Sequence, residues 1–197
     1  MSRPGLSVVK IGGSLLADRA RLAATLASLA SGAEGTCIAV PGGGPFADAV
    51  RGAQAALGFG DALAHRLALD AMGHVAEVLC ALEPRLARHT DPAALQRLAA
   101  SGRVPVWDPA ALRAGHPAVA ETWTVTSDSL ALWLAAETRA ARCVLVKAAP
   151  CPPGASPADL AASGLVDAAF PAFAARFSGE IVLRCAEADL RLGRQAA

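Results

Sequence analysis

Short apolar runs and longer amphipathic stretches alternate along the chain, and each has the period of one kind of secondary structure. The apolar runs are rich in β-branched residues, as buried strands are, and they cover residues 7–11, 36–40, 104–107, 143–147 and 180–184. The stretches between them are rich in Ala, Leu and Arg and are long enough for helices, at residues 19–31, 46–57, 61–86, 127–141 and 167–177. Strands that alternate with helices predict a mostly parallel sheet covered on both faces, which is an α/β fold.

The stretch that begins at Asp61 has one apolar helical arc, which also contains a histidine. When residues are placed at about 100° each, the apolar arc holds Leu67, Met72, Val75, Val78, Leu79 and Leu82. His65 falls inside this arc, and His74 falls at the edge of the polar one. A histidine that bonds a backbone group is the simpler interpretation of both. His65 remains a candidate for a functional role.

The length of the chain favours one domain. A chain of 197 residues can bury a full core, so we expect a single domain over residues 1–197. The Pro- and Gly-rich segment 149–159 indicates a surface loop rather than a linker between domains. No run approaches the roughly 18 to 20 consecutive apolar residues of a membrane span, and the N-terminus lacks the pattern of a secretory signal. The sequence therefore predicts a cytoplasmic protein that does not enter a membrane.

The net charge bears on the possible partners, and the cysteine content bears on the possible disulfides. The formal net charge is +1 and no block of like charges occurs, which argues against nucleic acid as a partner. An anionic ligand must therefore be held locally. Five cysteines, an odd number without CxxC spacing, argue against a disulfide framework. Four lie in apolar segments that predict burial, whereas Cys151 lies in the Pro-rich loop and is the candidate for an exposed thiol.

Two glycine loops follow the first two predicted strands. The segments are VVKIGGSLLAD at residues 8–18, with Gly12, Gly13 and Ser14, and IAVPGGGPFAD at residues 38–48, with Gly42, Gly43 and Gly44. Ligands of open α/β sheets bind beyond the carboxyl ends of strands, and glycine turns there let backbone N–H groups approach a phosphate. Neither loop has the order of glycines of a Walker A or dinucleotide-binding motif. Each loop alone is also explained as an ordinary turn.

A lysine precedes the first glycine loop. Lys10 lies two residues before Gly12 on the strand, so its side chain can reach the space between the two loops. Phosphoryl transfer mainly requires positioning and positive charge around the phosphate oxygens, and a lysine between two amide-lined loops supplies both. The chain contains only one other lysine, Lys147, which also lies at a strand end.

The segment TVTSDSL at residues 124–130 opens a predicted helix. Ser127 or Asp128 is a natural N-cap, and this role alone would explain both residues. In the functional interpretation, Asp128 holds Lys10 or a metal-bound nucleotide in place. Both interpretations remain open from the residues themselves.

With Lys10-Ile-Gly-Gly-Ser14, Pro41-Gly-Gly-Gly44 and Thr126-Ser-Asp-Ser-Leu130 in this order, the chain resembles the amino acid kinase superfamily. Within it, the chain is most similar to the [5-(aminomethyl)furan-3-yl]methyl phosphate kinases of methanofuran biosynthesis, through residues 41–51, 64–72, 122–135 and 164–177. The resemblance implies a three-layer αβα sandwich with a mostly parallel central sheet. It also implies ATP and Mg²⁺ as cofactors, a homo-oligomer, and conversion of a furanylmethyl phosphate to its diphosphate in the biosynthesis of methanofuran or an analogue.

The resemblance also implies roles for individual residues. Lys10 resembles the lysine that bridges donor and acceptor phosphates, and Asp128 resembles the carboxylate that orients it. The expected nucleotide-binding residues are Lys10, Gly12, Gly13, Ser14, Ser127 and Lys147. The expected substrate-binding residues are Gly42, Gly43, Gly44, His65 and Glu121, of which His65 would face the acceptor phosphate. The sequence indicates no protein ligand for the metal, and Mg²⁺ is expected on the nucleotide phosphates.

An aminomethyl group on the substrate requires a carboxylate, because an unpaired ammonium in a pocket is costly. Asp48, Asp70 and Glu121 are the candidates, and we expect Glu121, just before Trp123, to take this role. The chain departs from many relatives after the fourth strand, where residues 147–151 read KAAPC instead of an acidic, glycine-containing turn. Two alternatives follow: another kinase of the superfamily, of the isopentenyl phosphate or acyl-phosphate type, or a nucleotide-binding relative without turnover.

Overall fold

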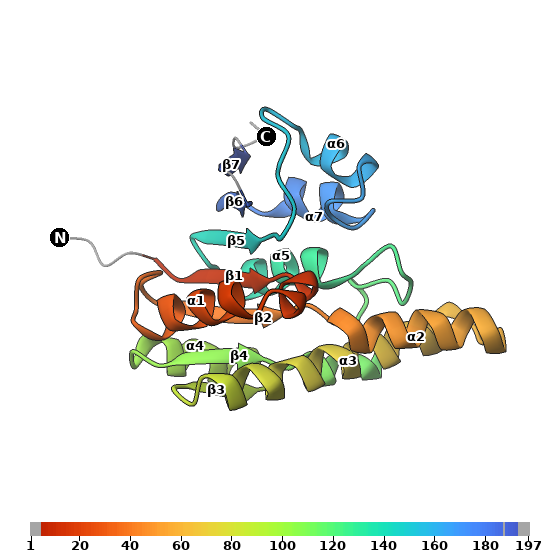
Figure 1. Ribbon diagram of the computed structural model, residues 1–197, viewed down its shortest axis with the longest axis horizontal. Helices are drawn as coiled ribbons and strands as arrows, with labels where there is room; N and C mark the ends of the chain where they lie inside the picture. The colour runs from red at the N-terminus through yellow and green to blue at the C-terminus, as the bar shows by residue number, and fades with distance from the viewer. Residues whose placement is uncertain (1–4, 187, 193–197) are drawn as a thin grey trace.

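A twisted sheet with helices on both faces forms the centre of the molecule (Figure 1). The structure is a computed structural model that describes residues 5–186 and 188–192. Within these residues the sheet has seven strands in the order β3-β4-β2-β1-β5-β6-β7. All neighbouring strands are parallel except β6 and β7. The strands are β1 (Ser7–Ile11), β2 (Cys37–Pro41), β3 (Leu86–His89), β4 (Val104–Trp107), β5 (Arg142–Val146), β6 (Glu180–Arg184) and β7 (Asp189–Leu192).

The helices make the outer two layers. The α-helices are α1 (Arg19–Ala30), α2 (Gly44–Leu57), α3 (Asp61–Leu82), α4 (Pro92–Ala100), α5 (Ser127–Glu137), α6 (Pro157–Ala162) and α7 (Phe170–Arg176). Two short 3-10 helices, η1 (Gly13–Ala17) and η2 (Pro109–Ala114), follow β1 and β4. The helices α1 and α3 pack on one face of the sheet, and α4 and α5 pack on the other. The α/β class and the three-layer sandwich are therefore confirmed.

The alternation of side chains along β1 decides which face receives Lys10. Val9 and Ile11 belong to the apolar cluster under α1 and α3, whereas Val8 belongs to the cluster under α5. Successive side chains of a strand point to opposite faces, so Lys10 points to the same face as Val8. The sequence of β1 therefore directs the one charged side chain of this buried strand toward the layer that contains α5.

Two regions differ from the elements predicted from the sequence. The helix expected over residues 61–86 ends at Leu82, because Glu83 precedes a proline and a residue in that position disfavours the helical conformation. Leu86 instead begins β3, which was not predicted, and neither were α4 and β7. The helix expected over 127–141 ends at Glu137, and the one expected over 167–177 is α7, which begins at Phe170. The loop expected over 149–159 contains the start of α6, where Ser156 and Asp159 form a capping box.

The cysteines also differ from the expectation. Cys151 and Cys185 form a disulfide, with their Cα atoms 5.7 Å apart, which lies in the usual range for such a bond. Cys37, Cys80 and Cys143 are free thiols. The disulfide joins the loop after β5 to the end of β6 across a separation of 34 residues. An odd number of cysteines therefore did not exclude one pair.

Hydropathy adds one finding about the helices. Throughout residues 5–186 and 188–192, every helix is too short or too polar to cross a lipid bilayer.

Candidate functional site

A cavity of about 520 Å³ lies at the carboxyl ends of β1 and β2. The helix α2 and the first part of α3 extend beyond these strand ends and form one wall (Figure 1). The segment that leads into α5 also lines the cavity, and its Trp123 contacts α2 through Arg51 and Gln54. Among the site residues predicted from the sequence, those that line the cavity are Lys10, Gly13, Ser14, Gly42, Gly43, Gly44, His65, Ser127 and Asp128. Gly12, Glu121 and Lys147 are not among the lining residues.

The two glycine loops are pressed against each other at the base of the cavity. The backbone N–H of Gly12 donates to the carbonyl of Val146 at 3.0 Å, and the N–H of Gly42 donates to Ile11 at 2.8 Å. A Cβ atom on Gly13 would lie 2.5 Å from the nitrogen of Gly44, which is closer than real Cβ contacts allow. Glycine is therefore required because two backbones meet here. The N-terminus of α2 begins at this junction and adds its partial positive charge.

Replacing Gly42 with alanine is expected to separate the two loops. Its new Cβ would lie 2.5 Å from the nitrogen of Gly13, and relief of such overpacking typically costs about 1 to 3 kcal/mol. We expect the free energy of unfolding to fall by that amount in a denaturant titration.

Gly52→Ala is the matched control. Gly52 lies inside α2 with open space around the position of its Cβ, so alanine should stabilise the helix by about 0.5 to 1 kcal/mol. Equal stability of Gly42→Ala and the wild type would contradict the close contact of the loops.

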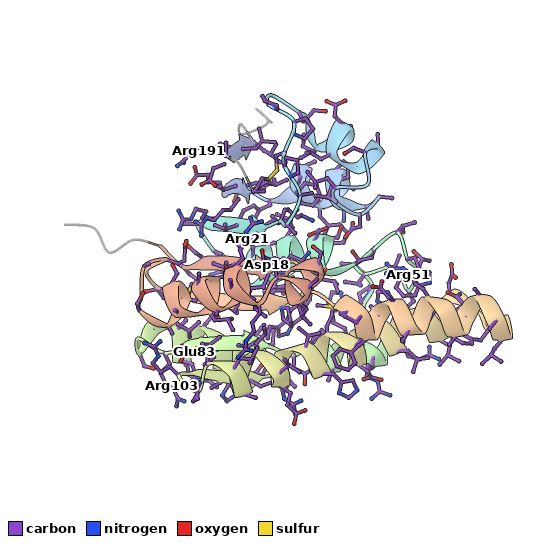
Figure 2. The ribbon with its side chains drawn as sticks, in the orientation of Figure 1. Asp18, Arg21, Arg51, Glu83, Arg103 and Arg191 are labelled. Carbon is purple, nitrogen blue, oxygen red and sulfur yellow. A yellow bond between two sulfur atoms is a disulfide. The ribbon has the colours of Figure 1, made fainter. Side chains whose placement is uncertain are left out.

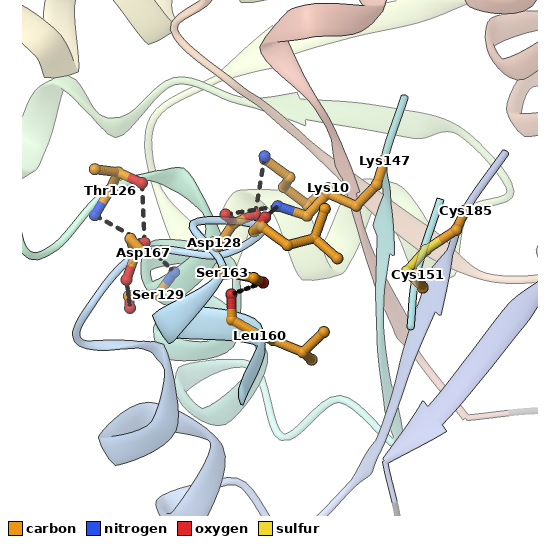
Figure 3. Close-up of polar contacts among 11 residues, drawn as sticks. Lys10, Thr126, Asp128, Ser129, Lys147, Cys151, Leu160, Ser163, Asp167 and Cys185 are labelled. Carbon is orange, nitrogen blue, oxygen red and sulfur yellow. Dashed lines mark hydrogen bonds and ion pairs between the residues drawn. A yellow bond between two sulfur atoms is a disulfide. The ribbon is translucent and has the colours of Figure 1, made fainter. Parts of the chain in front are cut away.

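Asp128 joins both lysines of the chain in one buried cluster (Figure 3). The Lys147 Nζ lies 2.7 Å from Oδ2 of Asp128 and also donates to the carbonyl of Leu165 at 2.6 Å. The Lys10 Nζ lies 2.9 Å from Oδ1 in an ion pair. All three side chains are less than a tenth exposed. One carboxylate thus faces two ammonium groups.

The charges of this cluster depend on one another. Burial by itself raises the pKa of Asp128, but the ammonium groups of Lys10 and Lys147 outweigh it and hold the pKa below its usual value. Burial and the charge of Lys10 lower the pKa of Lys147 to about 8, although Asp128 opposes this shift. Near neutral pH the cluster is therefore two cations and one anion. Its net positive charge adjoins the cavity through Lys10, which suits an anionic ligand.

The start of α5 is held by a carboxylate from a distant segment. Thr126 is the N-cap residue, without a cap bond from its own side chain. The Asp167 Oδ2 accepts from the backbone N–H of Thr126 and of Ser129, each at 3.0 Å, and its Oδ1 accepts from the hydroxyl of Ser129. Of the two interpretations that the sequence left open, the N-cap role of Ser127 or Asp128 is therefore wrong. Because Asp167 supplies this function, the side chain of Asp128 is free to face the lysines.

His65 lines the cavity, whereas Glu121 does not. His65 is buried on α3, and its Nδ1 lies 3.3 Å from the carbonyl oxygen of Thr122. Burial lowers the pKa of His65, although the carbonyl and Glu121 act in the opposite direction, so the ring is neutral near neutral pH and Nδ1–H donates. Glu121 pairs with Arg66 at 3.2 Å. The carboxylate of Glu121 is thus occupied by an arginine outside the cavity.

Among the other side chains that line the cavity, three are charged or aromatic and were given no firm role from the sequence. Asp48 and Arg51 come from α2, and Trp123 comes from the segment before α5. The guanidinium carbon of Arg51 lies 4.1 Å from the centroid of the Trp123 ring. Figure 2 shows Arg51 beyond the strand ends, near the segment that precedes α5. Arg51 lies seven residues after Gly44, and counting two turns along the predicted helix would have indicated it.

Side chains that could hold a metal by themselves do not gather anywhere in the described part of the chain. No three of its His, Cys, Asp and Glu residues form a group suited to a metal ion.

Comparison with known proteins gives one family and one curated relative. The sequence model of the amino acid kinase family matches residues 5–150. The curated [5-(aminomethyl)furan-3-yl]methyl phosphate kinase of Methanocaldococcus jannaschii is 31% identical over 131 residues, which is 66% of this chain and 59% of that protein. The alignment thus spans less than two thirds of the relative.

Solved structures of low sequence identity share the fold. Uridylate kinase from Archaeoglobus fulgidus has a TM-score of 0.64 at 20% identity, over 91% of this chain and 90% of that one. UMP kinase from Bacillus anthracis has a TM-score of 0.66 at 14% identity, over 97% and 100% of the two chains. Aspartate kinase from Synechocystis has a TM-score of 0.71 at 16% identity, over 98% of this chain and 40% of that one. At these identities the similarity concerns the fold alone.

Proposed function

The chain belongs to the amino acid kinase family, and on this premise we propose that it is an ATP-dependent kinase with a phosphate monoester as acceptor. The proposed acceptor is [5-(aminomethyl)furan-3-yl]methyl phosphate, because the curated relative acts on this compound by name. An oxygen of the acceptor phosphate attacks the γ-phosphorus of ATP. The bond from that phosphorus to the β–γ bridging oxygen breaks, so that ADP leaves and a diphosphate forms.

The observation that carries this proposal is the position of Lys10. Its ammonium adjoins a cavity whose base is formed by two touching glycine loops, and it is paired with the buried Asp128. Charge spreads over the phosphoryl oxygens in the transition state, and fixed cations and N–H groups in a partly desolvated site stabilise it. Lys10 is therefore proposed to contact the transferred group, while Asp128 keeps its side chain in place.

The remaining predicted residues divide between the two substrates. We assign Gly12, Gly13, Ser14 and Ser127 to the ATP phosphates, and Gly42, Gly43, Gly44 and His65 to the acceptor phosphate. Lys147 acts through Asp128, because its Nζ is bonded to that carboxylate and to a backbone carbonyl. Mg²⁺ bound to the ATP phosphates would add positive charge there, and it commonly keeps several waters and few protein ligands.

Exposed apolar side chains agree with the homo-oligomer that the resemblance implies. Phe46 and Leu57 on α2 are 42% and 78% exposed, and Leu63 on α3 is 41% exposed. Apolar side chains that gather on one surface often mark a contact between proteins. The oligomeric state stays a prediction.

An acceptor panel tests the proposed function. The folded protein is incubated with Mg²⁺-ATP and with the aminomethylfuran phosphate, isopentenyl phosphate, UMP or aspartate, and ADP release is measured. We expect the aminomethylfuran phosphate to give the highest kcat/KM, and its product to show two coupled ³¹P resonances. Faster turnover of another acceptor would favour a different kinase of the family. If no acceptor releases ADP although ATP binds, the chain would be a nucleotide-binding relative without turnover.

A further inference from the structure

One wall of the cavity carries an acidic, a positively charged and an aromatic side chain close together. Asp48 and Arg51 lie four and seven residues after Gly44, on the face of α2 that lines the cavity. With a rise of about 1.5 Å per residue, Asp48 lies roughly 6 Å along the helix from the glycine junction. A ligand whose phosphate lies at the glycine loops can therefore extend along α2 and present its far end to Asp48.

Asp48 is the carboxylate of the cavity that lysine does not neutralise. The acids that line the cavity, among the residues that the structure describes, are Asp48 and Asp128. Asp128 is already paired with Lys10 and Lys147. Asp48 pairs only with Arg51, at 3.2 Å, and its side chain is 72% exposed. Such an exposed ion pair within one helix is weak, so a ligand ammonium can compete for the carboxylate.

Trp123 is held so that its ring forms part of the same wall. Its Nε1 donates to Oε1 of Gln54 at 2.6 Å, and Gln54 in turn donates to the carboxylate of Asp61 at 2.8 Å. The guanidinium of Arg51 lies over the ring, so this aromatic face already accepts a cation. Flat rings and ammonium groups are both favourable partners for a tryptophan face.

We propose that Asp48, with Trp123 beside it, binds the aminomethyl group of the acceptor and makes the site selective for an aromatic ammonium compound. This inference rests on the proposed function and assigns one end of its acceptor. The acceptor phosphate lies toward Lys10 and the second glycine loop, the furan ring lies against Trp123, and the ammonium pairs with Asp48. Arg51 gives up its contact with Asp48 and keeps its place over the Trp123 ring.

The structure favours Asp48 over Glu121, the acid expected from the sequence. Glu121 is bonded to Arg66, and its side chain is not part of the cavity lining. An ammonium at Glu121 would have to displace this arginine and leave the cavity that holds the glycine loops. At Asp48 an ammonium would also displace an arginine, but Arg51 keeps its contact with the Trp123 ring, and the ammonium stays in the cavity that holds the glycine loops.

Two acceptors that differ only in the amine test this inference. The values of kcat/KM are measured with [5-(aminomethyl)furan-3-yl]methyl phosphate and with the analogue that carries methyl in place of aminomethyl. In Asp48→Asn we expect the preference for the amine to fall by about 10- to 100-fold, the effect of losing a charged hydrogen bond. The change should appear in KM for the amine, while kcat and the kinetics of the methyl analogue stay close to the wild type.

Two further variants decide between the outcomes. Glu77→Gln is the matched control, because Glu77 is also 72% exposed and also pairs with an arginine, Arg88, yet it lies outside the cavity lining. It should keep the wild-type preference. A preference retained by Asp48→Asn, or lost only in Glu121→Gln, would overturn the role of Asp48 while the kinase assignment stands. Failure of the wild type to phosphorylate either acceptor would overturn the proposed function and this inference together.

Discussion

Replacing Lys10 with alanine is expected to lower kcat by about 10²- to 10³-fold, the usual effect of removing one group that stabilises transition-state charge. The ammonium of Lys10 is the cation that adjoins both glycine loops in the cavity, and no other described lysine lines it. Affinity for ATP should change much less than kcat, because the loop N–H groups remain. Single-turnover rates and equilibrium binding of a non-hydrolysable ATP analogue measure the two effects separately.

Arg103→Ala is the control for the loss of one positive charge. Arg103 is exposed just before β4 (Figure 2), far from the cavity lining, so its removal should leave kcat within about 2-fold of the wild type. Full turnover by Lys10→Ala would remove the role assigned to this lysine. A loss of ATP affinity without loss of kcat would favour a binding protein over a kinase.

Replacing Asp128 with asparagine is expected to give the largest loss of stability in the site. Two buried ammonium groups would lose their shared counter-charge, and breaking a buried ion pair costs about 3 to 5 kcal/mol. We expect the free energy of unfolding to fall by that amount near neutral pH, and kcat to fall as Lys10 loses the group that holds it. Denaturant titration and steady-state kinetics measure the two losses.

The pH dependence distinguishes this electrostatic cause from a general loss of packing. The folded-state pKa of Lys147 is about 8, below its ordinary value of 10.5. Between these two values the folded state binds fewer protons than the unfolded state, so the contribution of this group to stability rises with pH. Removing Asp128 lowers the pKa of Lys147 further, because Asp128 opposes the shift.

The stability deficit of Asp128→Asn should therefore shrink as the pH rises. Asp70→Asn serves as the control, since Asp70 pairs with Arg113 in a more exposed ion pair, and such pairs contribute about 0 to 1 kcal/mol. An Asp128→Asn variant with the stability and pH profile of the wild type would show that the cluster does not act as a unit.

The fold was predictable where local pattern and final packing agree. The buried run of β1 is followed by glycines, and these two features suffice to predict both the strand and the turn after it. β3 was missed because its sequence, LARH, is only partly apolar at the edge of the sheet. The helix α4 carries a readable signal, since Asp91 is its N-cap and Pro92 its first residue.

The part of the site that lies at the ends of strands was predictable from the sequence, and the part that depends on distant segments was not. Parallel strands bring the loops after β1 and β2 together, so the meeting of Lys10 with the two glycine loops followed from the sequence. The function of Asp167 depends on bringing residue 167 to residues 126–129, which no local pattern contains. Lys147 was expected among nucleotide-binding residues, and its bond to Asp128 follows from side-chain alternation along β5, which places it on the same face as Lys10.

Two proposed functions belong to different parts of the structure. Acceptor selection is assigned to the wall that contains α2, whereas phosphoryl transfer is assigned to Lys10, which lies on a central strand. Its backbone is fixed on both sides, by Val40 of β2 and by Leu145 of β5, so a change there would disturb the whole sheet. The cavity wall formed by α2 and Trp123 belongs to elements outside the sheet. Variant libraries that diversify this wall should therefore change which acceptors are phosphorylated, without changing the position of Lys10.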